Sequence, residues 1–377
     1  MATSTDCLNP LSDAPRADRI LVIRLGALGD VVRTLPAVAG LRRLYPMAQI
    51  SWLVEPASAG VVAACREIDD VIVLPRPALE AELRGLRIAR LVRRLASVVL
   101  DLRSRRFDLV VDWHGILKSG LLARSSGASV RVGYAAPYAR ELSSLLLNRR
   151  ARLCAPPLSR FRRNAGLVTF LAGPAGEEMK PEAGAIALDP ATRHNMVDAL
   201  GGGRRQAVVM HPGTSAGTPF KRWPAQRYSE VARRLARETG RPCVVTAGPR
   251  REERALALAV VAGAAGAARL APATEDLVEL AALYAACALF IGSDSGPLHV
   301  ASAVGTPVVQ LIGPTHPVEN EPNPATPWRR VRVDMPCSPC RRGCAEVDCM
   351  NAISSEQVIE AALDLLGDAL PLARSAP

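Results

Sequence analysis

The sequence is poor in aromatic residues and in lysine. Phe, Trp and Tyr make up 4% of the 377 residues, and the only lysines are Lys118, Lys180 and Lys221, so arginine supplies nearly all of the positive charge. We find no Walker A loop, no G-x-S-x-G elbow, no HExxH and no DxD pair beside a strand end. These absences argue against P-loop NTPases, serine hydrolases, zincins and transferases that hold a nucleotide through Mg²⁺.

Long apolar runs are also missing. No run approaches the roughly 18–20 residues that span a bilayer. Residues 1–19 lack the apolar core of a signal peptide. No basic patch is interleaved with aromatics, as nucleic-acid modules have, and we therefore expect no nucleic-acid partner. We expect a cytoplasmic protein that could rest on a membrane surface as a peripheral protein.

The sequence does contain enough apolar residues for a large core, at 49%. Its charge is uneven: residues 1–180 hold 27 Lys and Arg against 16 Asp and Glu, a net of +11, whereas residues 181–377 hold 20 of each. Arginine-rich codon usage explains the excess as well as a functional cause does. A functional cause would be an anionic partner for the first half, such as a phosphorylated substrate or a phospholipid.

Buried strands alternate with helices along the chain, which predicts doubly wound, mostly parallel α/β sheets. The alternation stops at residues 173–184, a stretch rich in Gly, Pro and charge, and then restarts. We therefore predict two Rossmann-like domains facing each other across a cleft, with a loose N-terminus before them and a closing helix after them. The expected bounds are 1–18 for the N-terminus, 19–175 and 186–353 for the two domains, and 354–370 for the helix.

One long helix is predicted from Leu79 to Arg103, with arginines on one face and leucines on the other. An ordinary amphipathic surface helix explains this pattern. The alternative is contact with phosphate headgroups or an anionic glycolipid, for which Arg84 and Arg87 are candidate acceptor-binding residues.

Two polar turns in the second half suggest a phosphate-binding site. The stretch from Phe290 to Leu311 reads as a buried strand, a small-residue turn and a helix, with Asp294, Ser295, Gly296 and His299 at the turn and the helix start. Free N–H groups at such a helix start bind phosphate or diphosphate. Helix capping by Asp294 or Ser295 and a buried core histidine are the alternatives.

The other turn, from His211 to Pro224, follows a short apolar strand. It places Lys221 beside Arg222, with Thr214 and Ser215 as further donors. The compact charge of lysine suits a departing phosphate oxygen. The alternative is a solvated loop lysine.

A third turn, Gly26-Ala-Leu-Gly29-Asp30, follows the first strand. Its spacing does not match G-x-G-x-x-G, and Asp30 would repel a pyrophosphate, which disfavours a NAD-dependent dehydrogenase. Asp30 either caps a helix or accepts a proton from a hydroxyl.

Two further groups are weaker candidates. Glu252 or Glu253, after a strand end, could bind ribose hydroxyls, or could simply be solvated at a helix start. Cys337, Cys340, Cys344 and Cys349 lie in one loop, and their number suits zinc. Reduced structural thiols are the alternative that we favour, as they are for the five other cysteines, which are scattered singly.

Taken together, these segments resemble glycosyltransferase family 9, the ADP-heptose:lipopolysaccharide heptosyltransferases. The resemblance covers about Arg19 to Leu366. It rests on Ile20–Ala37, Asp112–Ser119, His211–Ser215, Lys221–Pro224 and Ser293–His299, and the middle of the first half is most similar to heptosyltransferase I. It implies a GT-B fold with an N-terminal acceptor-binding domain, a C-terminal nucleotide-sugar-binding domain and a last helix that crosses back to the first domain. It also implies inverting, metal-independent transfer of heptose from ADP-L-glycero-D-manno-heptose to the Kdo region of the lipopolysaccharide inner core, with no cofactor. The protein would act as a peripheral protein on the inner face of the inner membrane.

The resemblance also implies roles for single residues. Asp30 becomes the general base and Lys221 a diphosphate contact. The donor would further meet Thr214, Ser215, Arg222, Asp294, Ser295, Gly296 and His299, with Glu252 or Glu253 on the ribose. The acceptor would meet Gly29, Lys118 and Arg140. Alternatives are a nucleotide-sugar 2-epimerase, a family member with another sugar donor and a carbohydrate-binding protein without activity.

Overall fold

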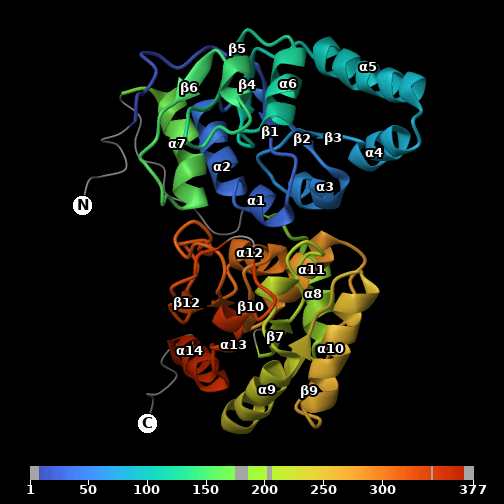
Figure 1. The fold of residues 1–377 in the computed structure, drawn as a ribbon, viewed down its shortest axis with the longest axis vertical. Helices are drawn as coiled ribbons and strands as arrows, with labels where there is room; N and C mark the ends of the chain where they lie inside the picture. The colour runs from blue at the N-terminus through green and yellow to red at the C-terminus, as the bar shows by residue number, and fades with distance from the viewer. Residues whose placement is uncertain (1–7, 175–185, 202–205, 341–342, 369–377) are drawn as a thin grey trace. The chain divides into compact units, whose positions relative to one another are not determined.

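The computed structural model describes residues 8–174, 186–201, 206–340 and 343–368, which fall into two units. Unit 1 comprises Met1–Pro181 and Ala185–Ala187, and unit 2 comprises Glu182–Gly184 and Leu188–Pro377. Apart from Gly173 and Pro174, the expected linker at 173–184 lies outside the described residues. Each unit is an α/β sheet with flanking helices (Figure 1).

The sheet of unit 1 contains six parallel strands in the order β3-β2-β1-β4-β5-β6. Residues Ile20 to Ile23 of β1 are fully buried, as expected for a parallel strand covered on both faces. The strands are β1 (Arg19–Ile23), β2 (Gln49–Val54), β3 (Asp70–Val73), β4 (Leu109–Asp112), β5 (Val130–Tyr134) and β6 (Arg149–Ala151). The helices are α1 (Leu28–Val32), α2 (Leu35–Leu44), α3 (Pro56–Ala63), α4 (Arg76–Arg84), α5 (Ile88–Ser104), α6 (Leu117–Ser125) and α7 (Arg160–Ala172), with a 3₁₀ turn, η1, at Ser143–Leu146.

Unit 2 repeats this topology. Its six parallel strands run in the order β12-β11-β10-β7-β8-β9. The strands are β7 (Val208–His211), β8 (Cys243–Val245), β9 (Ala268–Leu270), β10 (Leu289–Ser293), β11 (Val308–Leu311) and β12 (Trp328–Val331). The helices are α8 (Pro190–Ala199), α9 (Ala225–Thr239), α10 (Arg251–Gly263), α11 (Leu277–Ala286), α12 (Gly296–Ala303), α13 (Asp348–Asn351) and α14 (Ser355–Asp368), with a 3₁₀ turn, η2, at Pro219–Lys221.

Both strand orders contain one switch point, where the chain reverses its direction of travel across the sheet. It lies between β1 and β4 in unit 1 and between β7 and β10 in unit 2. Open α/β sheets bind ligands beyond the carboxyl ends of the strands at this point. Asp30 follows β1, and Asp294 follows β10. The topology therefore places two of the predicted site residues where such sheets bind ligands.

The predicted helix from Leu79 to Arg103 is wrong as a single element. The structure has α4 and α5, separated at Gly85 to Arg87. Leu86 has φ = 52°, in the left-handed region, so the helix cannot run through it. Gly85 beside it is a poor helix former, and this is the signal in the sequence that we missed.

Other parts of the fold were not predicted. Residues 313–350 are rich in Pro and Cys, which predicts a long loop, but strand β12 lies within them. Its Trp-Arg-Arg-Val sequence lacks the apolar run of an inner strand. Of the N-terminal residues expected to be loose, Asn9 and Leu11 are held in place by hydrogen bonds. The Leu11 amide donates to the Phe170 carbonyl at 3.0 Å, and Asn9 Oδ1 accepts from the Arg152 amide at 2.6 Å.

Helix α14 packs against α9 and β12, inside unit 2, and its return to the first domain stays a prediction.

Cys65, Cys243 and Cys287 are buried free thiols, but Cys154 is disulfide-bonded and is not the reduced thiol that we expected. Within the described ranges no helix combines the length and the apolar character needed to cross a bilayer.

Candidate active site

Asp30 lies on α1 directly after the glycine turn that follows β1, and three guanidinium groups surround its carboxylate. The distances are 2.5 Å to Arg24, 3.0 Å to Arg33 and 3.1 Å to Arg160. Its side chain remains 23% exposed, so an incoming hydroxyl can reach it. Ala27 is the N-cap of α1, so Asp30 is not the capping residue that we considered as the alternative.

Electrostatics keep this carboxylate ionised. Burial by itself would raise the pKa of Asp30, but the charges of Arg24, Arg33, Arg160 and Arg163 outweigh that effect and hold the pKa well below its usual range. Four guanidinium groups against one carboxylate leave the site with excess positive charge. Such a site suits an acceptor that carries acidic groups of its own.

Sequence reasoning missed these arginines. Arg24 directly follows the buried strand β1, where a charge is unusual, and that signal could have been read. Arg160 and Arg163 stand at the start of α7, some 130 residues after Asp30, and only the fold brings them to it. The guanidinium of Arg163 also lies 5.4 Å from the centre of the Tyr134 ring.

The segment after β4 forms the other side of this switch point. The Asp112 carboxylate accepts from the amides of His114 and Gly115 at 2.8 and 3.2 Å and from Ser119 Oγ at 2.8 Å. His114 Nδ1 in turn accepts from the Leu25 amide at 3.2 Å. Burial, helped by the charge of Arg24, lowers the pKa of His114 to about 3, so this ring is neutral and fixes the turn. His114 therefore shapes the site as a neutral ring, and Asp112 holds the turn through the hydrogen bonds that it accepts.

The residues predicted to contact the acceptor lie on several elements of unit 1. Gly29 is buried inside α1, and its carbonyl accepts from Arg33 Nε at 3.0 Å. Lys118 on α6 donates to Glu55 Oε1 at 2.9 Å. Arg140 is exposed, and its amide donates to the Gly115 carbonyl, which ties it to the loop after β4. Arg84 lies at the end of α4, and Arg87 lies in the turn that follows it.

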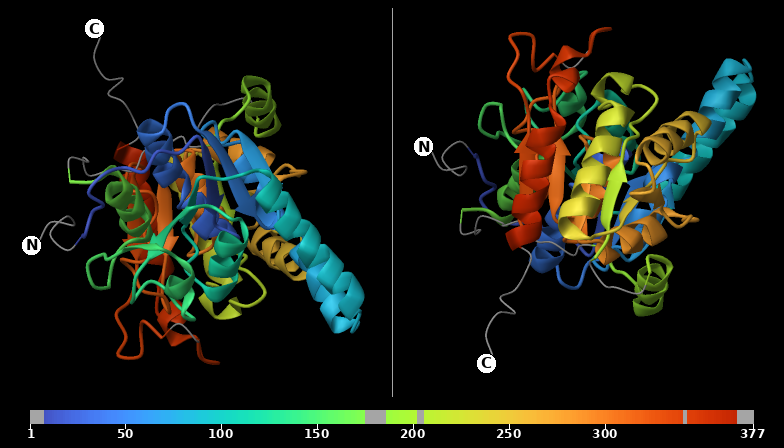
Figure 2. Two further views of the ribbon diagram at one scale, coloured as in Figure 1. Left: turned by 90° about the horizontal axis from the view of Figure 1, so that it is seen from above. Right: turned by 90° about the horizontal axis from the view of Figure 1, so that it is seen from below.

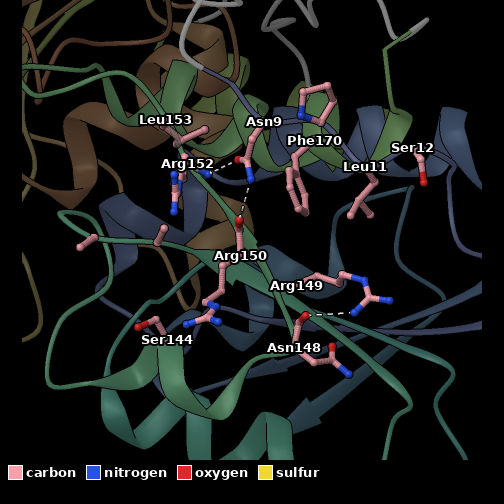
Figure 3. Close-up of a pocket in the computed structure, with 13 residues that line it drawn as sticks. Asn9, Leu11, Ser12, Ser144, Asn148, Arg149, Arg150, Arg152, Leu153 and Phe170 are labelled. Carbon is pink, nitrogen blue, oxygen red and sulfur yellow. Dashed lines mark hydrogen bonds between the residues drawn. The ribbon is translucent and has the colours of Figure 1, made fainter.

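A hollow of about 890 Å³ in unit 1 is lined by none of the predicted site residues (Figure 3). Arg149, Arg150 and Arg152 line it, together with Asn9 and Phe170. It lies along the edge strand β6, whereas Asp30 lies beside β1, and β4 and β5 stand between these strands in the sheet. We do not assign this hollow to the site around Asp30.

In unit 2 the structure brings Lys221 and Asp294 together across the switch point. The ammonium donates to Asp294 Oδ2 at 2.8 Å, and Thr315 Oγ1 donates to the same oxygen at 2.8 Å. His299 Nε2 lies 3.4 Å from Asp294 Oδ1. Lys221 is mostly buried by these contacts, so it is not the solvated loop lysine of our alternative interpretation.

The start of α12 offers hydrogen-bond donors to a ligand. Ser295 is the N-cap residue, but its side chain caps no backbone amide, and Gly296 is the first residue of the helix. Among the described residues, Ser295 Oγ is buried and has no hydrogen-bond partner. A buried hydroxyl without a partner is costly, and a ligand oxygen would satisfy it together with the free amides of the helix.

The turn after β7 adds a guanidinium. Thr214 Oγ1 donates to the Thr218 carbonyl at 2.8 Å and accepts from Arg222 Nε at 3.3 Å. Ser215 Oγ hydrogen-bonds Thr218 Oγ1 at 2.8 Å, on the exposed side of the turn. Within the part of the chain that the structure describes, Arg222 Nη2 is buried without a partner. It is therefore a second donor available to an anion.

The two candidate glutamates on α10 have different surroundings. Glu252 is 60% exposed and pairs with Arg222 at 2.5 Å. Glu253 is 9% exposed and pairs with Arg250 at 3.1 Å. A Cβ built on Gly213 would lie 3.3 Å from Glu253 Oε1, and one on Gly248 would overlap this carboxylate. Glu253 therefore packs on the turns after β7 and β8, and Glu252 borders the Arg222 side.

The four clustered cysteines form no recognisable metal site. Cys337 and Cys344 are exposed, whereas Cys349 is buried. Burial, followed by the neighbouring thiols of Cys340, Cys344 and Cys337, raises the pKa of Cys349. Among the described residues no group of three or more His, Cys, Asp or Glu side chains is placed to hold an ion. Zinc at this loop stays a prediction.

The family model and the curated relatives agree on one family. The model of glycosyltransferase family 9 (heptosyltransferase) matches residues 95–350. Lipopolysaccharide heptosyltransferase 1 of Pseudomonas aeruginosa is 30% identical over 337 residues, which cover 85% of this chain and 86% of that protein.

Two solved structures share the fold. One is a family 9 glycosyltransferase from Veillonella parvula, with a TM-score of 0.73 and 24% identity, covering 93% of this chain and 97% of that one. The other is E. coli heptosyltransferase WaaC with ADP, with a TM-score of 0.72 and 20% identity, covering 92% and 99%. These matches confirm the predicted GT-B fold, and the family match confirms that the chain is a glycosyltransferase. The chain belongs to glycosyltransferase family 9, the heptosyltransferases.

Proposed function

We propose that this protein transfers L-glycero-D-manno-heptose from ADP-heptose to the Kdo region of the lipopolysaccharide inner core, with inversion at the anomeric carbon and without a metal ion. The similarity to heptosyltransferase 1 of P. aeruginosa supports the choice of reaction. The solved WaaC structures contain ADP and ADP-2-deoxy-2-fluoro heptose, which supports the choice of donor. We place the reaction at the cytoplasmic face of the inner membrane, where the protein would be peripheral.

The observation that carries the proposal is the ionised Asp30 within its group of arginines. In the proposed step Asp30 takes the proton of the acceptor hydroxyl while the oxygen attacks the anomeric carbon. The bond from that carbon to the diphosphate oxygen breaks on the opposite face, and ADP leaves with the electron pair. One proton moves to Asp30, and one glycosidic bond replaces one glycosyl phosphate bond.

The same arginines make Asp30 a weak base in the free protein, because they lower its pKa. A Kdo-bearing acceptor brings carboxylates, and these would compete with Asp30 for Arg24, Arg33 and Arg160. Each guanidinium that turns to the acceptor raises the pKa of Asp30 and strengthens it as a base. The acidic acceptor thus helps to activate the group that deprotonates it.

The leaving group would be stabilised in unit 2. Lys221 Nζ, Ser295 Oγ and Arg222 Nη2 supply donors for the diphosphate charge that develops as the bond breaks. Asp294 holds Lys221 in place and is held itself by Thr315. Asp294 is therefore a positioning residue, and His299 supports it from the buried side.

A thermal-shift screen with ADP, ADP-heptose and other nucleotide sugars tests the donor, because a ligand that binds the folded state raises its melting temperature. Transfer is then measured by mass spectrometry as the gain of one heptose on a Kdo-bearing lipid acceptor, with EDTA present. Preference for another nucleotide sugar would reject the donor. Turnover of the donor without acceptor would indicate an epimerase, and binding without any turnover would reject enzymatic activity on these substrates.

A further inference from the structure

We propose that helices α4 and α5 form a docking surface for an anionic phospholipid membrane. This tip comprises Leu83 to Leu95, where α4 ends and α5 begins. It projects away from the sheet of unit 1, and α5 leads from it back to the sheet (Figures 1 and 2). The inference rests on the proposed function only in that the acceptor is a membrane lipid. The surface itself is argued from exposure and charge.

The tip exposes large aliphatic side chains in one short segment. Leu86 is 81% exposed, Val92 57% and Ile88 54%, and Leu83 and Leu95 are exposed as well. Scattered exposed leucines are ordinary on protein surfaces, but five large aliphatic side chains within thirteen residues form a concentrated patch. This segment therefore differs from the rest of the surface.

The apolar stripe of α5 continues from the protein core into solvent. Ile88, Val92, Leu95 and Val99 are spaced four, three and four residues apart, so they lie on one face of the helix. Farther along α5, Leu102 is buried, and Val98 packs against the core of unit 1. An ordinary amphipathic helix buries its stripe along its whole length. In α5 the apolar stripe of the first two turns is exposed to solvent.

The charge of the same segment is of one sign. Residues 83–95 contain five arginines and no acidic residue. Arg87 and Arg94 lie near the buried Glu82 of α4, at 3.7 and 3.4 Å, which ties the two helices together. Arg90 and Arg93 are exposed and have no acidic partner among the residues that the structure describes. The free positive charge therefore faces solvent beside the aliphatic side chains.

This combination favours a lipid surface over the other partners. A second copy of the chain would bring ten arginines together and would be repelled. An anionic membrane attracts guanidinium groups to its headgroups while aliphatic side chains enter the boundary below them. The long arginine side chains can reach headgroups while their stems stay on the apolar side.

The test measures sedimentation of the full-length protein with vesicles, without donor or acceptor. We expect binding to vesicles of phosphatidylcholine with phosphatidylglycerol, weaker binding at raised salt, and little binding to phosphatidylcholine alone. The variant Leu86→Ser/Ile88→Ser/Val92→Ser should bind about tenfold more weakly or not at all, because fewer apolar side chains enter the membrane. The variant Arg90→Gln/Arg93→Gln should lose about tenfold in affinity for anionic vesicles.

Control variants change similar exposed residues elsewhere. Met47→Ser/Leu145→Ser/Leu258→Ser removes three exposed apolar side chains, and Arg237→Gln/Arg254→Gln removes two exposed charges. Both should sediment like the original protein. All variants change exposed side chains, and circular dichroism checks their folding.

Several outcomes would overturn the proposal: equal binding to neutral and anionic vesicles, the same loss in control and tip variants, or a dimer in sedimentation equilibrium that only the tip variants abolish. Because no substrate is present, lipid binding can succeed where heptose transfer fails. In that case the proposed function falls and the docking surface stands.

Discussion

The carboxylate of Asp30 lies 2.5 Å from the guanidinium of Arg24, which is itself buried at the end of β1. This pair links the chemistry of the site to its stability. The carboxylate that we propose as the base also neutralises an arginine that the sheet cannot expose to water. A change at Asp30 should therefore act on turnover and on folding by different routes.

Asp30→Asn should abolish heptose transfer, with a loss of about 10²–10⁴ in rate, because the amide cannot accept the acceptor proton. The melting temperature should fall, since Arg24 loses its charged partner. ADP should still raise the melting temperature of the variant, because the donor residues belong to unit 2. Turnover near the original level would place the base elsewhere.

Lys221→Ala should lower kcat/KM for the nucleotide sugar by roughly 10²–10³, because the ammonium no longer stabilises the leaving diphosphate. Lys118→Ala is the matched control, since Lys118 pairs with Glu55 in unit 1. It should raise KM for the acceptor and leave the effect of ADP on the melting temperature unchanged. If both variants lose donor binding equally, the assignment of Lys221 to the donor is wrong.

Glu252→Gln and Glu253→Gln should separate the two candidates for the ribose. We expect Glu253→Gln to weaken ADP binding about tenfold, because Glu253 packs against the turns after β7 and β8, where a nucleotide would lie. Glu252→Gln should have a smaller effect, through Arg222 alone. Isothermal titration with ADP measures both, and the reverse order would assign the ribose to Glu252.

The sequence predicted inner strands and helices closely where a local signal was complete. Strand β2 is predicted over 49–54 and helix α9 over 225–239, and the structure has both at these bounds. Most residues of β2 are apolar, and α9 is periodic and ends before Gly240, which has φ = 66°. Strand β12 was not predicted, because its charged residues do not match the apolar pattern of an inner strand. The helix from Leu79 was predicted too long because its amphipathic pattern continues across the break at Gly85.

The candidate site was predictable only in part, for a physical reason. Asp30, Lys221 and Asp294 each follow a strand end within a short turn, so a local motif marks them. The guanidinium groups around Asp30 come partly from α7, which local sequence does not connect with β1. The depressed pKa of Asp30 is a property of that tertiary arrangement, and no motif contains it.

Heptose transfer should proceed at an unchanged rate in EDTA, because the proposed leaving-group donors are protein groups and need no metal ion. The same samples should be assayed for zinc by mass spectrometry, since Cys337, Cys340, Cys344 and Cys349 lie close in sequence. Cys337→Ser/Cys340→Ser is the matching variant. A strict requirement for a divalent ion would contradict the metal-free mechanism, and bound metal with full activity in EDTA would assign it a structural role.

Acid should destabilise the protein partly through His211. Burial lowers the pKa of His211 to about 4, and a nearby Glu253 opposes this only partly. In the unfolded chain the ring has a pKa near 6.5, so between about pH 4 and 6.5 the unfolded state binds more protons than the folded state. The stabilisation is therefore complete above pH 6.5 and is lost as the pH falls towards 4, by about 3 kcal/mol for this residue.

Urea unfolding at a series of pH values measures this loss. His211→Asn should be less stable at pH 7, because its hydrogen bond to Thr246 changes, but its stability should fall less steeply between pH 6.5 and 4. His194→Asn is the control, since that side chain is 75% exposed and stays hydrated in the folded state. If His211→Asn keeps the full slope of the original protein, other groups cause the acid sensitivity, and His211 is not the buried neutral imidazole that the fold requires at the end of β7.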